Sequence, residues 1–392
     1  MTPVRDAEVI VVGAGPAGAA LAIQLARRGR AVLLLDQTAF PRDKACGEFY
    51  SPGVADALER LGVLDTVLAQ EHRRHGGMTI VRGADRFALR YAPPRRGLSI
   101  RRRLLDQTLL AEVAASGAVV RQRARVSGVL TQDGTIAGVR LRGGEELRAG
   151  FVAGADGHHS TIARALGLER PVRWPRSLGL IAHFQLAPGA LPWAEMHVGG
   201  RFYCGLNPVA DGLVNVGLVG PLGTRRRGES AAQHLERLLD ALPTARERLV
   251  GASWDGSVRG IGPLAHHASR LAGPGFLLLG DAAEFFDPFT GEGVYRALRG
   301  AELAAEGIEL ALGRADRLPL GYVEARRAAF DAKQRLCVVI QLLLRSPRTL
   351  GYALRRLEAR PELGAGLSGA LGDYLPPEPV LAPGSLLALL KP

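Results

Sequence analysis

The chain has 392 residues, of which 47% are hydrophobic and 22% charged, and its formal net charge is +12. This length exceeds one usual hydrophobic core, so we expect two or more domains, and the composition excludes a disordered or collagen-like protein. The positive charge does not indicate a nucleic-acid partner, because the arginines are spread along the chain and the short runs at 101–103 and 225–227 lack interleaved aromatic residues.

The three cysteines, Cys46, Cys204 and Cys337, lie far apart in the sequence. None has CxxC or metal-ligand spacing, so we expect no disulfide framework, no metal site and a reducing, cytoplasmic location. The N-terminal residues lead directly into an apolar strand, without the separate apolar region and cleavage site of a signal peptide. No uncharged apolar run reaches the roughly 18 residues that a membrane-spanning helix needs.

Residues 8–36 have the pattern of a strand–helix–strand unit. A β-branched run at 8–12 ends in Gly13-Ala-Gly-Pro-Ala-Gly18, a helical pattern follows at 17–28, and a second apolar strand at 31–35 ends in Asp36. This context makes the glycine motif a dinucleotide-binding fingerprint. Its glycines allow a tight turn, close approach of a pyrophosphate and close packing of helix on strand, while the helix N-terminus stabilises phosphate and Asp36 accepts hydrogen bonds from ribose hydroxyls. We expect cofactor contacts from Gly13, Gly15, Pro16, Ala17, Gly18 and Asp36.

Two further motifs follow, each after a short apolar strand. Residues 151–164 read FVAGADGHHSTIAR, and residues 276–298 read FLLLGDAAEFFDPFTGEGVYRAL. Together with the glycine motif, they resemble the p-hydroxybenzoate-hydroxylase-type flavoproteins, the group A flavin monooxygenase superfamily, over about residues 5–310. The resemblance implies an α/β fold: a Rossmann-like FAD-binding domain with a parallel sheet, an antiparallel β-sheet substrate domain and a helical C-terminal segment.

The resemblance also implies how FAD is bound. Asp281 would bond the ribitol chain, Pro288 would flank the isoalloxazine ring, and the backbone of 291–293 would face the N1/C2=O edge of the ring. Asp156 would organise the loop near the pyrophosphate. Arg102, with Arg101 as the fallback, would contact the pyrophosphate, and the backbone of Val126 would contact adenine. The cofactor residues so implied are Arg102, Val126, Asp156, Gly280, Asp281, Pro288, Gly291, Glu292, Gly293 and Val294.

The domain division follows from these motifs and from the segments between them. Period-two hydrophobic patterns at 78–91, 178–186, 194–208 and 213–219 predict a sheet with one face on the FAD domain and the other solvated. Substrate would bind between this sheet and the flavin. We predict a discontinuous FAD-binding domain of residues 1–75, 98–172 and 268–325, a substrate-binding sheet of residues 76–97 and 173–267, and a helical segment of residues 326–392.

Within the superfamily, the chain is most similar to the geranylgeranyl reductases. The likeness lies in PRDKACGE at 41–48, NPVADGLVNVG at 207–217 and TGEG at 290–293. One departure is that the YxWxFP motif of those reductases becomes FYCGLNP at 202–208, without tryptophan, which puts the substrate in doubt. The WxWxIP motif of the flavin halogenases is absent, and Lys44 is the only lysine before residue 333, so halogenation is not expected.

The resemblance therefore implies a FAD-dependent reductase of carbon–carbon double bonds in a hydrophobic, polyprenyl-type substrate, with hydride from N5 of the reduced flavin. The alternative is an NAD(P)H- and oxygen-dependent monooxygenase that hydroxylates an aromatic or polyketide-like substrate through a flavin C4a-hydroperoxide. NAD(P)H has no second fingerprint and would bind transiently in either case. A proton donor has to lie within hydrogen-bond reach of the substrate; the candidates are Cys46, Glu48, Tyr50, Tyr203 and Glu292.

Two apolar C-terminal stretches, 335–345 and 385–390, have two interpretations. They form helices that cover the core, or a hydrophobic edge for peripheral membrane contact. The sequence does not indicate an oligomeric state.

Overall fold

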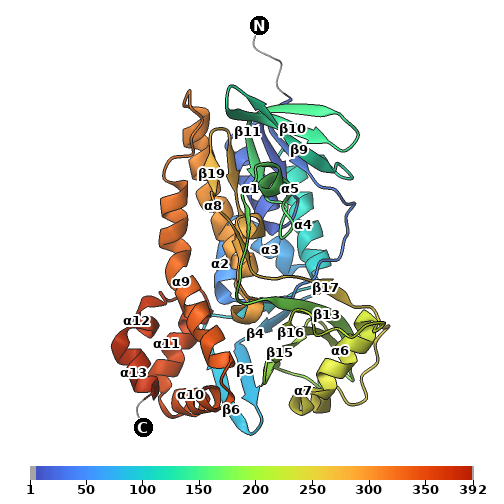
Figure 1. Cartoon of the computed structure of the whole chain (residues 1–392), viewed down its shortest axis with the longest axis vertical. Coiled ribbons are helices and arrows are strands. Elements are labelled where there is room, and N and C mark those ends of the chain that lie inside the picture. The colour runs from blue at the N-terminus through green and yellow to red at the C-terminus, as the bar shows by residue number, and fades with distance from the viewer. Residues whose placement is uncertain (1–5, 391–392) are drawn as a thin grey trace.

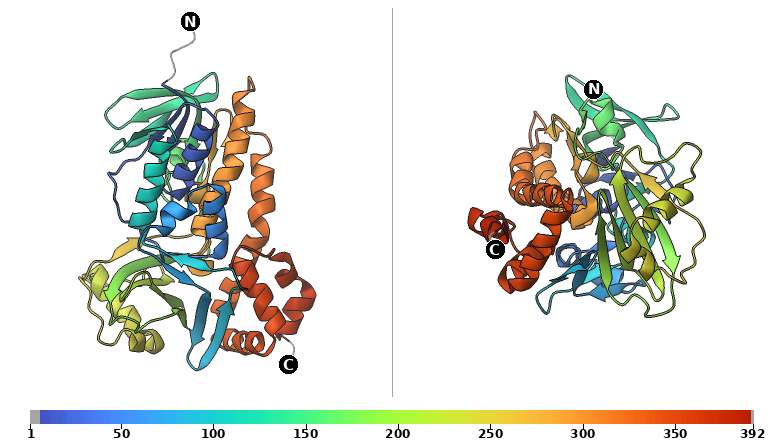
Figure 2. Two further views of the ribbon diagram at one scale, coloured as in Figure 1. Left: turned by 180° about the vertical axis from the view of Figure 1, so that it is seen from behind. Right: turned by 60° about the horizontal axis from the view of Figure 1, so that its bottom comes forward.

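The computed structural model describes residues 6–390 (Figure 1). The described residues do not include 1–5 and 391–392, which are the outer ends of the first and last predicted segments. Residues 1–5 are also the first positions of the N-terminal stretch that lacks a signal-peptide pattern. A parallel sheet with helices forms one end of the molecule, a second sheet forms the other, and the C-terminal helices lie beside the second sheet (Figures 1 and 2). The predicted fold class is confirmed.

The first sheet is the predicted strand–helix–strand unit extended on both sides. β1 lies at its centre and pairs in parallel with β2 and β11. Alternate residues of β1 enter two different cores. Val9 and Val11 face the helices α1 (Pro16–Arg27), α4 (Arg102–Ala115) and α8 (Gly293–Leu312). Ile10 and Val12 face the layer of β9, β10 and α5 (Thr161–Ala165). Burial on both faces explains the continuous apolar run in its sequence. The strands are β19 (Ala272–Gly273), β20 (Phe276–Leu278), β11 (Glu146–Gly154), β1 (Ala7–Val12), β2 (Val32–Leu35) and β8 (Val119–Arg121), with β10 (Thr135–Leu141) and β9 (Val126–Gln132) added at β11.

The second sheet contains the segments with period-two patterns. Its strands, in spatial order, are β17 (Arg259–Ile261), β13 (Ser177–Gln185), β16 (Leu213–Pro221), β15 (Phe202–Pro208), β14 (Ala194–Gly199), β5 (Gly77–Arg82) and β6 (Asp85–Arg90). All neighbours pair antiparallel except β14 and β5, which pair in parallel. The expectation of a solvated face is wrong: α6 (Ala231–Asp240) and α7 (Pro243–Arg248) cover that face, and Leu235 and Leu239 pack there with Cys204, Leu206 and Val216.

Two small sheets form mainly where the chain crosses between the large sheets. They are β3 (Phe49–Tyr50) with β7 (Gly97–Ser99) and β4 (Arg73–His75), and β12 (Glu169–Pro171) with β18 (His266–Ala268) and β21 (Glu284–Phe285). The remaining helices are α1 (Pro16–Arg27), α2 (Pro52–Arg60), α3 (Leu64–Leu68), α4 (Arg102–Ala115), α5 (Thr161–Ala165), α8 (Gly293–Leu312), α9 (Tyr322–Leu344), α10 (Pro347–Ala359), α11 (Pro361–Leu371), α12 (Glu378–Leu381) and α13 (Pro383–Leu390), with the 3₁₀ turns η1 (Gly280–Ala282) and η2 (Pro288–Thr290). Among residues 6–390, no helix combines the length and apolar character needed to cross a bilayer.

A buried ion pair fastens the C-terminal helices to the start of α2. Lys333 of α9 donates to Asp373 Oδ1 at 2.7 Å and to the carbonyl oxygen of Ala370 at 2.6 Å. The second oxygen of Asp373 accepts a 2.6 Å hydrogen bond from Ser51. Ser51 occupies the N-cap position of α2, but its hydroxyl bonds Asp373 in the C-terminal segment and does not cap the helix. Gly53 permits this contact, because a Cβ there would lie 2.5 Å from Asp373 Cβ.

A second buried contact joins the seven-stranded sheet to the turn before α8. Tyr203 of β15 donates a 2.6 Å hydrogen bond to Asp287 Oδ1, which also accepts from the backbone N–H of Phe289 at 2.9 Å. The Tyr203 ring packs edge-on against Phe289 with ring centroids 5.0 Å apart. Burial raises the pKa of Asp287 to about 6 despite these two donors.

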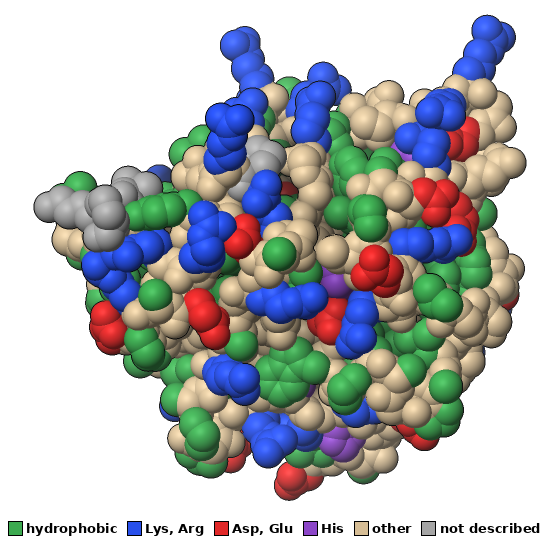
Figure 3. All heavy atoms as spheres, turned by 90° about the horizontal axis from the view of Figure 1, so that it is seen from below, with side chains coloured by type: hydrophobic (Ala, Val, Ile, Leu, Met, Phe, Trp, Pro, Cys, Tyr) green, Lys and Arg blue, Asp and Glu red, His purple; other side chains and the backbone are tan. Residues whose placement is uncertain are grey.

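The face seen from below carries basic, acidic and hydrophobic side chains interspersed with one another (Figure 3). In the described part of the C-terminal segment, Leu342, Leu375 and Leu387 are exposed. Membrane contact by this segment stays a prediction.

Replacing Lys333 with methionine should lower the free energy of unfolding by about 3–5 kcal/mol, because the Asp373 carboxylate would stay buried without its cation. Chemical denaturation of the full chain measures the loss, and the double variant Lys333→Met/Asp373→Asn should recover part of it. Arg314→Met, which breaks the exposed pair Arg314–Asp316, is the control and should leave unfolding unchanged. A Lys333→Met chain as stable as wild type would contradict a structural role for the pair.

Asp287 should make stability depend on pH. Between pH 4 and 6 the folded chain keeps the Asp287 proton that the unfolded chain, with a carboxyl pKa of about 3.9, has lost, so the free energy of unfolding falls as pH rises. Above about pH 6 the cost is constant, at about 3 kcal/mol for a shift of this size. Denaturant unfolding from pH 4.5 to 8 measures the free energy of unfolding of wild type and of Asp287→Asn. The free energy of the variant should rise relative to that of wild type up to about pH 6.5, and the difference between them should then stay constant. Asp56→Asn, at an exposed position, should show no such trend, and a gap for Asp287→Asn that is flat with pH would refute the assignment.

Candidate functional site

A cavity of about 580 Å³ runs from the glycine-rich turn after β1 to the seven-stranded sheet. Its walls come from all three sequence motifs, from the loop 42–50 after β2, and from strands β13 to β16 of the sheet. The structure therefore brings together segments that are up to about 280 residues apart in the chain, from Gly13 to Gly293.

The glycine-rich turn leaves an open floor at one end of this cavity. Gly13 has φ +100°, and a Cβ there would lie 2.4 Å from the carbonyl oxygen of Ala155. A Cβ on Gly18 would lie 1.8 Å from the carbonyl oxygen of Gly13. At Gly15, in contrast, the nearest atom to a Cβ is 3.7 Å away, and α1 starts at the next residue with no side chain capping its free N–H groups. Uncapped N–H groups at a helix N-terminus beside an open floor fit a phosphate group.

Asp36 lies at the end of β2 and lines the same end of the cavity. Its Oδ2 accepts a hydrogen bond from the backbone N–H of Ala14 at 2.9 Å, and its Oδ1 accepts from the N–H and hydroxyl of Thr38 at 2.8 and 2.6 Å. These bonds fix the carboxylate against the glycine turn, where a ribose hydroxyl would reach it. Val126, at the start of β9, lines the cavity beside this site.

Two arginines lie near Gly15, and the sequence indicated only one. Arg102 is bound by Asp106, with two parallel hydrogen bonds of 2.9 Å. Arg42 lies 3.0 Å from Asp106 and 3.9 Å from Asp36, and its NH2 is the nearest group to the Gly15 floor. Arg42 was missed although it is part of the PRDKACGE stretch. Arg101, the fallback, precedes α4 and is not among the lining residues.

The second motif shapes the cavity wall mainly through hydrogen bonds within the loop. Asp156 accepts hydrogen bonds from the Ser160 hydroxyl and the Thr161 N–H, both at 2.6 Å, so its carboxylate holds the turn into α5. Burial raises the pKa of Asp156. Lys44, another residue not singled out for the site, reaches this wall from the opposite loop, with Nζ 3.8 Å from the Cβ position of Gly157.

The third motif contributes Asp281 and the turn before α8. Asp281 follows Gly280, which has φ +58°, and it lines the cavity. Burial raises its pKa, against the opposing positive charge of Lys44. Pro288, Gly291, Gly293 and Val294 also line the cavity, and α8 begins at Gly293, so the N-terminus of this helix faces the cavity.

The seven-stranded sheet presents three rows of side chains on its cavity face. The strand registers define an apolar row of Tyr203, Val219, Gly179 and Ile261, a row of Met196, Gly205, Gly217 and Ile181, and a polar row of Asn207, Asn215 and His183. All members of the first two rows line the cavity, and of the polar row only Asn207 does. The cavity thus has an apolar floor bounded on one side by polar groups.

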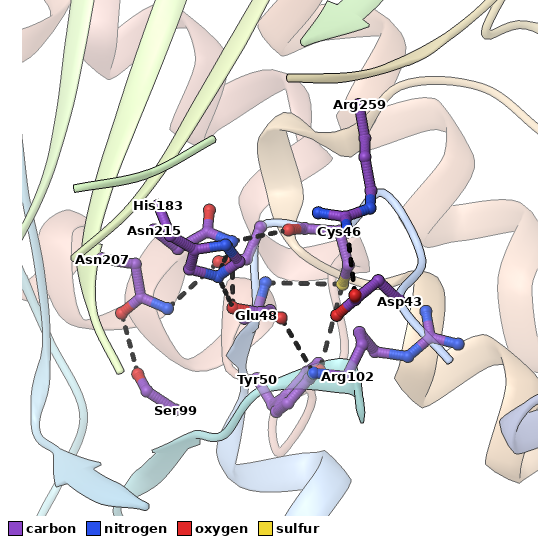
Figure 4. A network of polar contacts seen from close by, with 11 residues as sticks. Asp43, Cys46, Glu48, Tyr50, Ser99, Arg102, His183, Asn207, Asn215 and Arg259 are labelled. Carbon is purple, nitrogen blue, oxygen red and sulfur yellow. Dashed lines mark hydrogen bonds and ion pairs between the residues drawn. The ribbon is translucent and has the colours of Figure 1, made fainter. Parts of the chain in front are cut away.

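The polar row holds the loop 46–48 in place (Figure 4). Asn215 Nδ2 donates to the carbonyl oxygen of Cys46 at 2.9 Å and to Glu48 Oε2 at 3.0 Å. Asn207 Nδ2 donates to the carbonyl oxygen of Gly47 at 3.1 Å. Glu48 Oε2 lies 2.7 Å from His183 Nε2, and Glu48 Oε1 accepts from the backbone N–H of Arg102 at 2.9 Å. These bonds hold Glu48 at φ 56°, a left-handed conformation that is uncommon for a residue other than glycine.

Cys46 and Tyr50 lie on the cavity side of this loop. The Cys46 sulfur accepts from the Glu48 N–H at 3.4 Å and is 3.9 Å from the Tyr50 hydroxyl (Figure 4). Both residues line the cavity. Burial raises the pKa of the Cys46 thiol and of the Tyr50 hydroxyl, so both groups keep their protons at neutral pH.

The other predicted proton donors are placed differently. Tyr203 lines the cavity, but its hydroxyl proton is engaged with Asp287. Glu292 is not among the lining residues, and its carboxylate contacts Cys337 and Arg296 behind the cavity wall. Among residues 6–390, no cluster of three or more His, Cys, Asp or Glu side chains is arranged to hold a metal ion.

Comparison with solved structures supports the fold. A flavoprotein/dehydrogenase from Cytophaga hutchinsonii superposes with a TM-score of 0.85 at 22% sequence identity, covering 98% of each chain. At this identity the likeness concerns the fold alone.

Comparison with curated proteins gives closer relatives. A menaquinone reductase from Mycolicibacterium smegmatis is 34% identical over 318 residues, which cover 76% of each chain. Digeranylgeranylglycerophospholipid reductase 2 from Methanopyrus kandleri is 32% identical over 328 residues, covering 77% of this chain and 78% of the relative. The family model described as "FAD binding domain" matches residues 6–334. With these matches and a cavity whose glycine floor, helix N-termini and carboxylates fit a dinucleotide, the chain belongs to the FAD binding domain family and is a FAD-dependent oxidoreductase.

Proposed function

We propose that this enzyme reduces carbon–carbon double bonds in a hydrophobic, isoprenoid-type lipid or quinone. The observation that carries the proposal is the cavity itself, in which two protonated side chains, Cys46 and Tyr50, lie between the dinucleotide loops and an apolar floor. The relatives named above act, by their names, on menaquinone and on a geranylgeranyl phospholipid, which are both hydrophobic molecules.

In this proposal FAD lies along the cavity. Gly15 and the N-terminus of α1 bind the pyrophosphate together with Arg42 and Arg102, and Asp36 binds the adenosine ribose. Asp281 binds the ribitol chain, and the turn from Pro288 to Val294 holds the isoalloxazine ring. When bound and reduced, FAD supplies the hydride for the reaction, and NAD(P)H serves as its transient electron donor.

The substrate lies on the apolar floor of the sheet. Met196, Val219 and Ile261 line the cavity there, and apolar surface favours an apolar chain or ring by about 25 cal/mol for each Å² buried. Gly205 leaves space in this floor: the atoms nearest to a Cβ at this position would be those of Met196 and the backbone of Gly217, at 3.5–3.9 Å. The division of the chain into a FAD-binding domain and a substrate-binding sheet is part of the proposal.

Cys46 is the proton donor that the geometry favours, with Tyr50 behind it. Glu48 is a positioning residue, because both of its carboxylate oxygens accept hydrogen bonds from the polar row and from Arg102. The Glu48 N–H in turn bonds the Cys46 sulfur, so the carboxylate fixes the place of the thiol. The proton for the second carbon of the double bond would then come from Cys46, at the edge of the apolar floor.

The reaction type can be tested by mass. The holoenzyme is incubated anaerobically with NADPH or dithionite and with menaquinone or a geranylgeranyl phospholipid. A product about 2 Da heavier, formed without oxygen and still about 2 Da heavier after any quinol has been reoxidised in air, is the expected result for addition of hydride and proton to a carbon–carbon double bond. A product about 16 Da heavier that requires oxygen would replace this proposal with the monooxygenase alternative.

Cys46→Ser should lower kcat by about 100-fold, the usual contribution of a general acid, because a serine hydroxyl gives up its proton less readily than a thiol. The absorbance of bound FAD and the melting temperature should stay at wild-type values. Cys204→Ser is the matched control, since Cys204 is fully buried on the other face of the sheet; it should lower stability and leave kcat unchanged. Equal kcat in wild type and Cys46→Ser would remove Cys46 from the mechanism.

A further inference from the structure

Glu292 occupies an unusual place in the turn that faces the cavity. Its two neighbours, Gly291 and Gly293, both line the cavity, whereas the Glu292 side chain is turned away from it and is 5% exposed. Glu292 is also the residue before the first turn of α8, so its carboxylate lies at the positive end of that helix. A buried acid at this position does not take part in the proton transfer proposed above.

The contacts of Glu292 keep its charge in place but do not fully neutralise it. The Cys337 thiol donates to Oε1 at 3.1 Å, and Arg296 NH1 lies 3.6 Å from the same oxygen. Within the described part of the chain, Oε2 is buried and has no hydrogen-bond partner. Burial raises the pKa of Cys337, so its thiol stays a proton donor to the carboxylate.

The nearby cations are shared with other groups. Arg296 also contacts Glu284 and donates to Gln334 at 2.9 Å. Lys333 is bound by Asp373 and the Ala370 carbonyl. The carboxylate of Glu292 is therefore a partly compensated negative charge behind the cavity wall, where the low dielectric of the interior lets it act over a longer distance than in water.

From this placement we infer that Glu292 tunes the redox potential of the bound flavin. Reduction adds negative charge to the ring, which the N-terminus of α8 stabilises. The Glu292 carboxylate opposes that effect and so disfavours the reduced state. The consequence is a lower potential and a stronger hydride donor. This inference rests on FAD lying in the cavity and is independent of the proposed substrate.

The matched pair Glu292→Gln and Glu292→Asp tests the inference, because the first removes the charge and keeps the shape while the second keeps the charge. The midpoint potential of each holoenzyme is measured anaerobically against a reference dye, without substrate. Glu292→Gln should favour reduced flavin about tenfold, which is ~30 mV for a two-electron couple. Glu292→Asp should stay close to wild type. Equal potentials for wild type and Glu292→Gln, or equal shifts in both variants, would overturn the inference.

A second variant gives the opposite sign. Arg296→Gln removes the cation that partly compensates Glu292, so it should lower the potential, whereas a merely structural disturbance of the turn would shift both variants in the same direction. FAD content, measured by absorbance, shows that each variant is loaded before its potential is compared. A product assay that fails with wild type would refute the proposed reaction and leave these potentials unaffected.

Discussion

The site depends on how a loop without regular structure is held between two sheets. Residues 46–48 have no strand partner for their backbone carbonyl groups, and a buried carbonyl without a partner is costly. Asn207 and Asn215, on neighbouring strands of the second sheet, donate to the carbonyl oxygens of Gly47 and Cys46. The Glu48 carboxylate reaches back to the same sheet and also to the start of α4. One loop is thus fixed to both halves of the molecule, and the thiol of Cys46 is placed with it.

This arrangement gives a physical reason for one sequence feature that the chain shares with the geranylgeranyl reductases and for two features in which it differs from them. The second asparagine of the stretch 207–217 holds the loop, so the likeness at that position reflects a structural contact. Asn207 stands where those reductases have phenylalanine, and it provides a second contact of the same kind, with its own oxygen accepting from Ser99 at 2.8 Å. Gly205 stands where they have tryptophan and leaves the floor of the cavity open. In this chain Asn207 thus anchors the loop at a second point, and Gly205 leaves space beside it.

Much of the fold could be predicted from the sequence, because its signals are local. The glycine turn, the buried strands on either side and the alternating strands of the second sheet follow from steric needs and from hydrophobic period. The helices α6 and α7 were missed as a cover for the sheet, since alternation in a strand shows that two faces differ but not what packs on the outer one. Arg42 and His183 were missed for another reason: each acts through a residue far away in the chain, Asp106 for Arg42 and Glu48 for His183. The orientation of Glu292 was equally beyond the sequence, because the direction of one side chain in a glycine-rich turn is decided by α9, which packs behind it.

The helix α9 has a consequence for how the protein is made. It runs beside α8 from the dinucleotide sheet to the C-terminal helices (Figure 1). Lys333 of α9 binds Asp373, which accepts a hydrogen bond from Ser51 at the start of α2. Cys337 of α9 donates to Glu292 in the turn before α8. During synthesis the glycine turn and the loop 42–50 leave the ribosome first. The contacts that fix Ser51 and Glu292 form only after residues 333–373 have been made. We therefore expect cofactor capture in its final geometry to be completed only after residue 373 has left the ribosome.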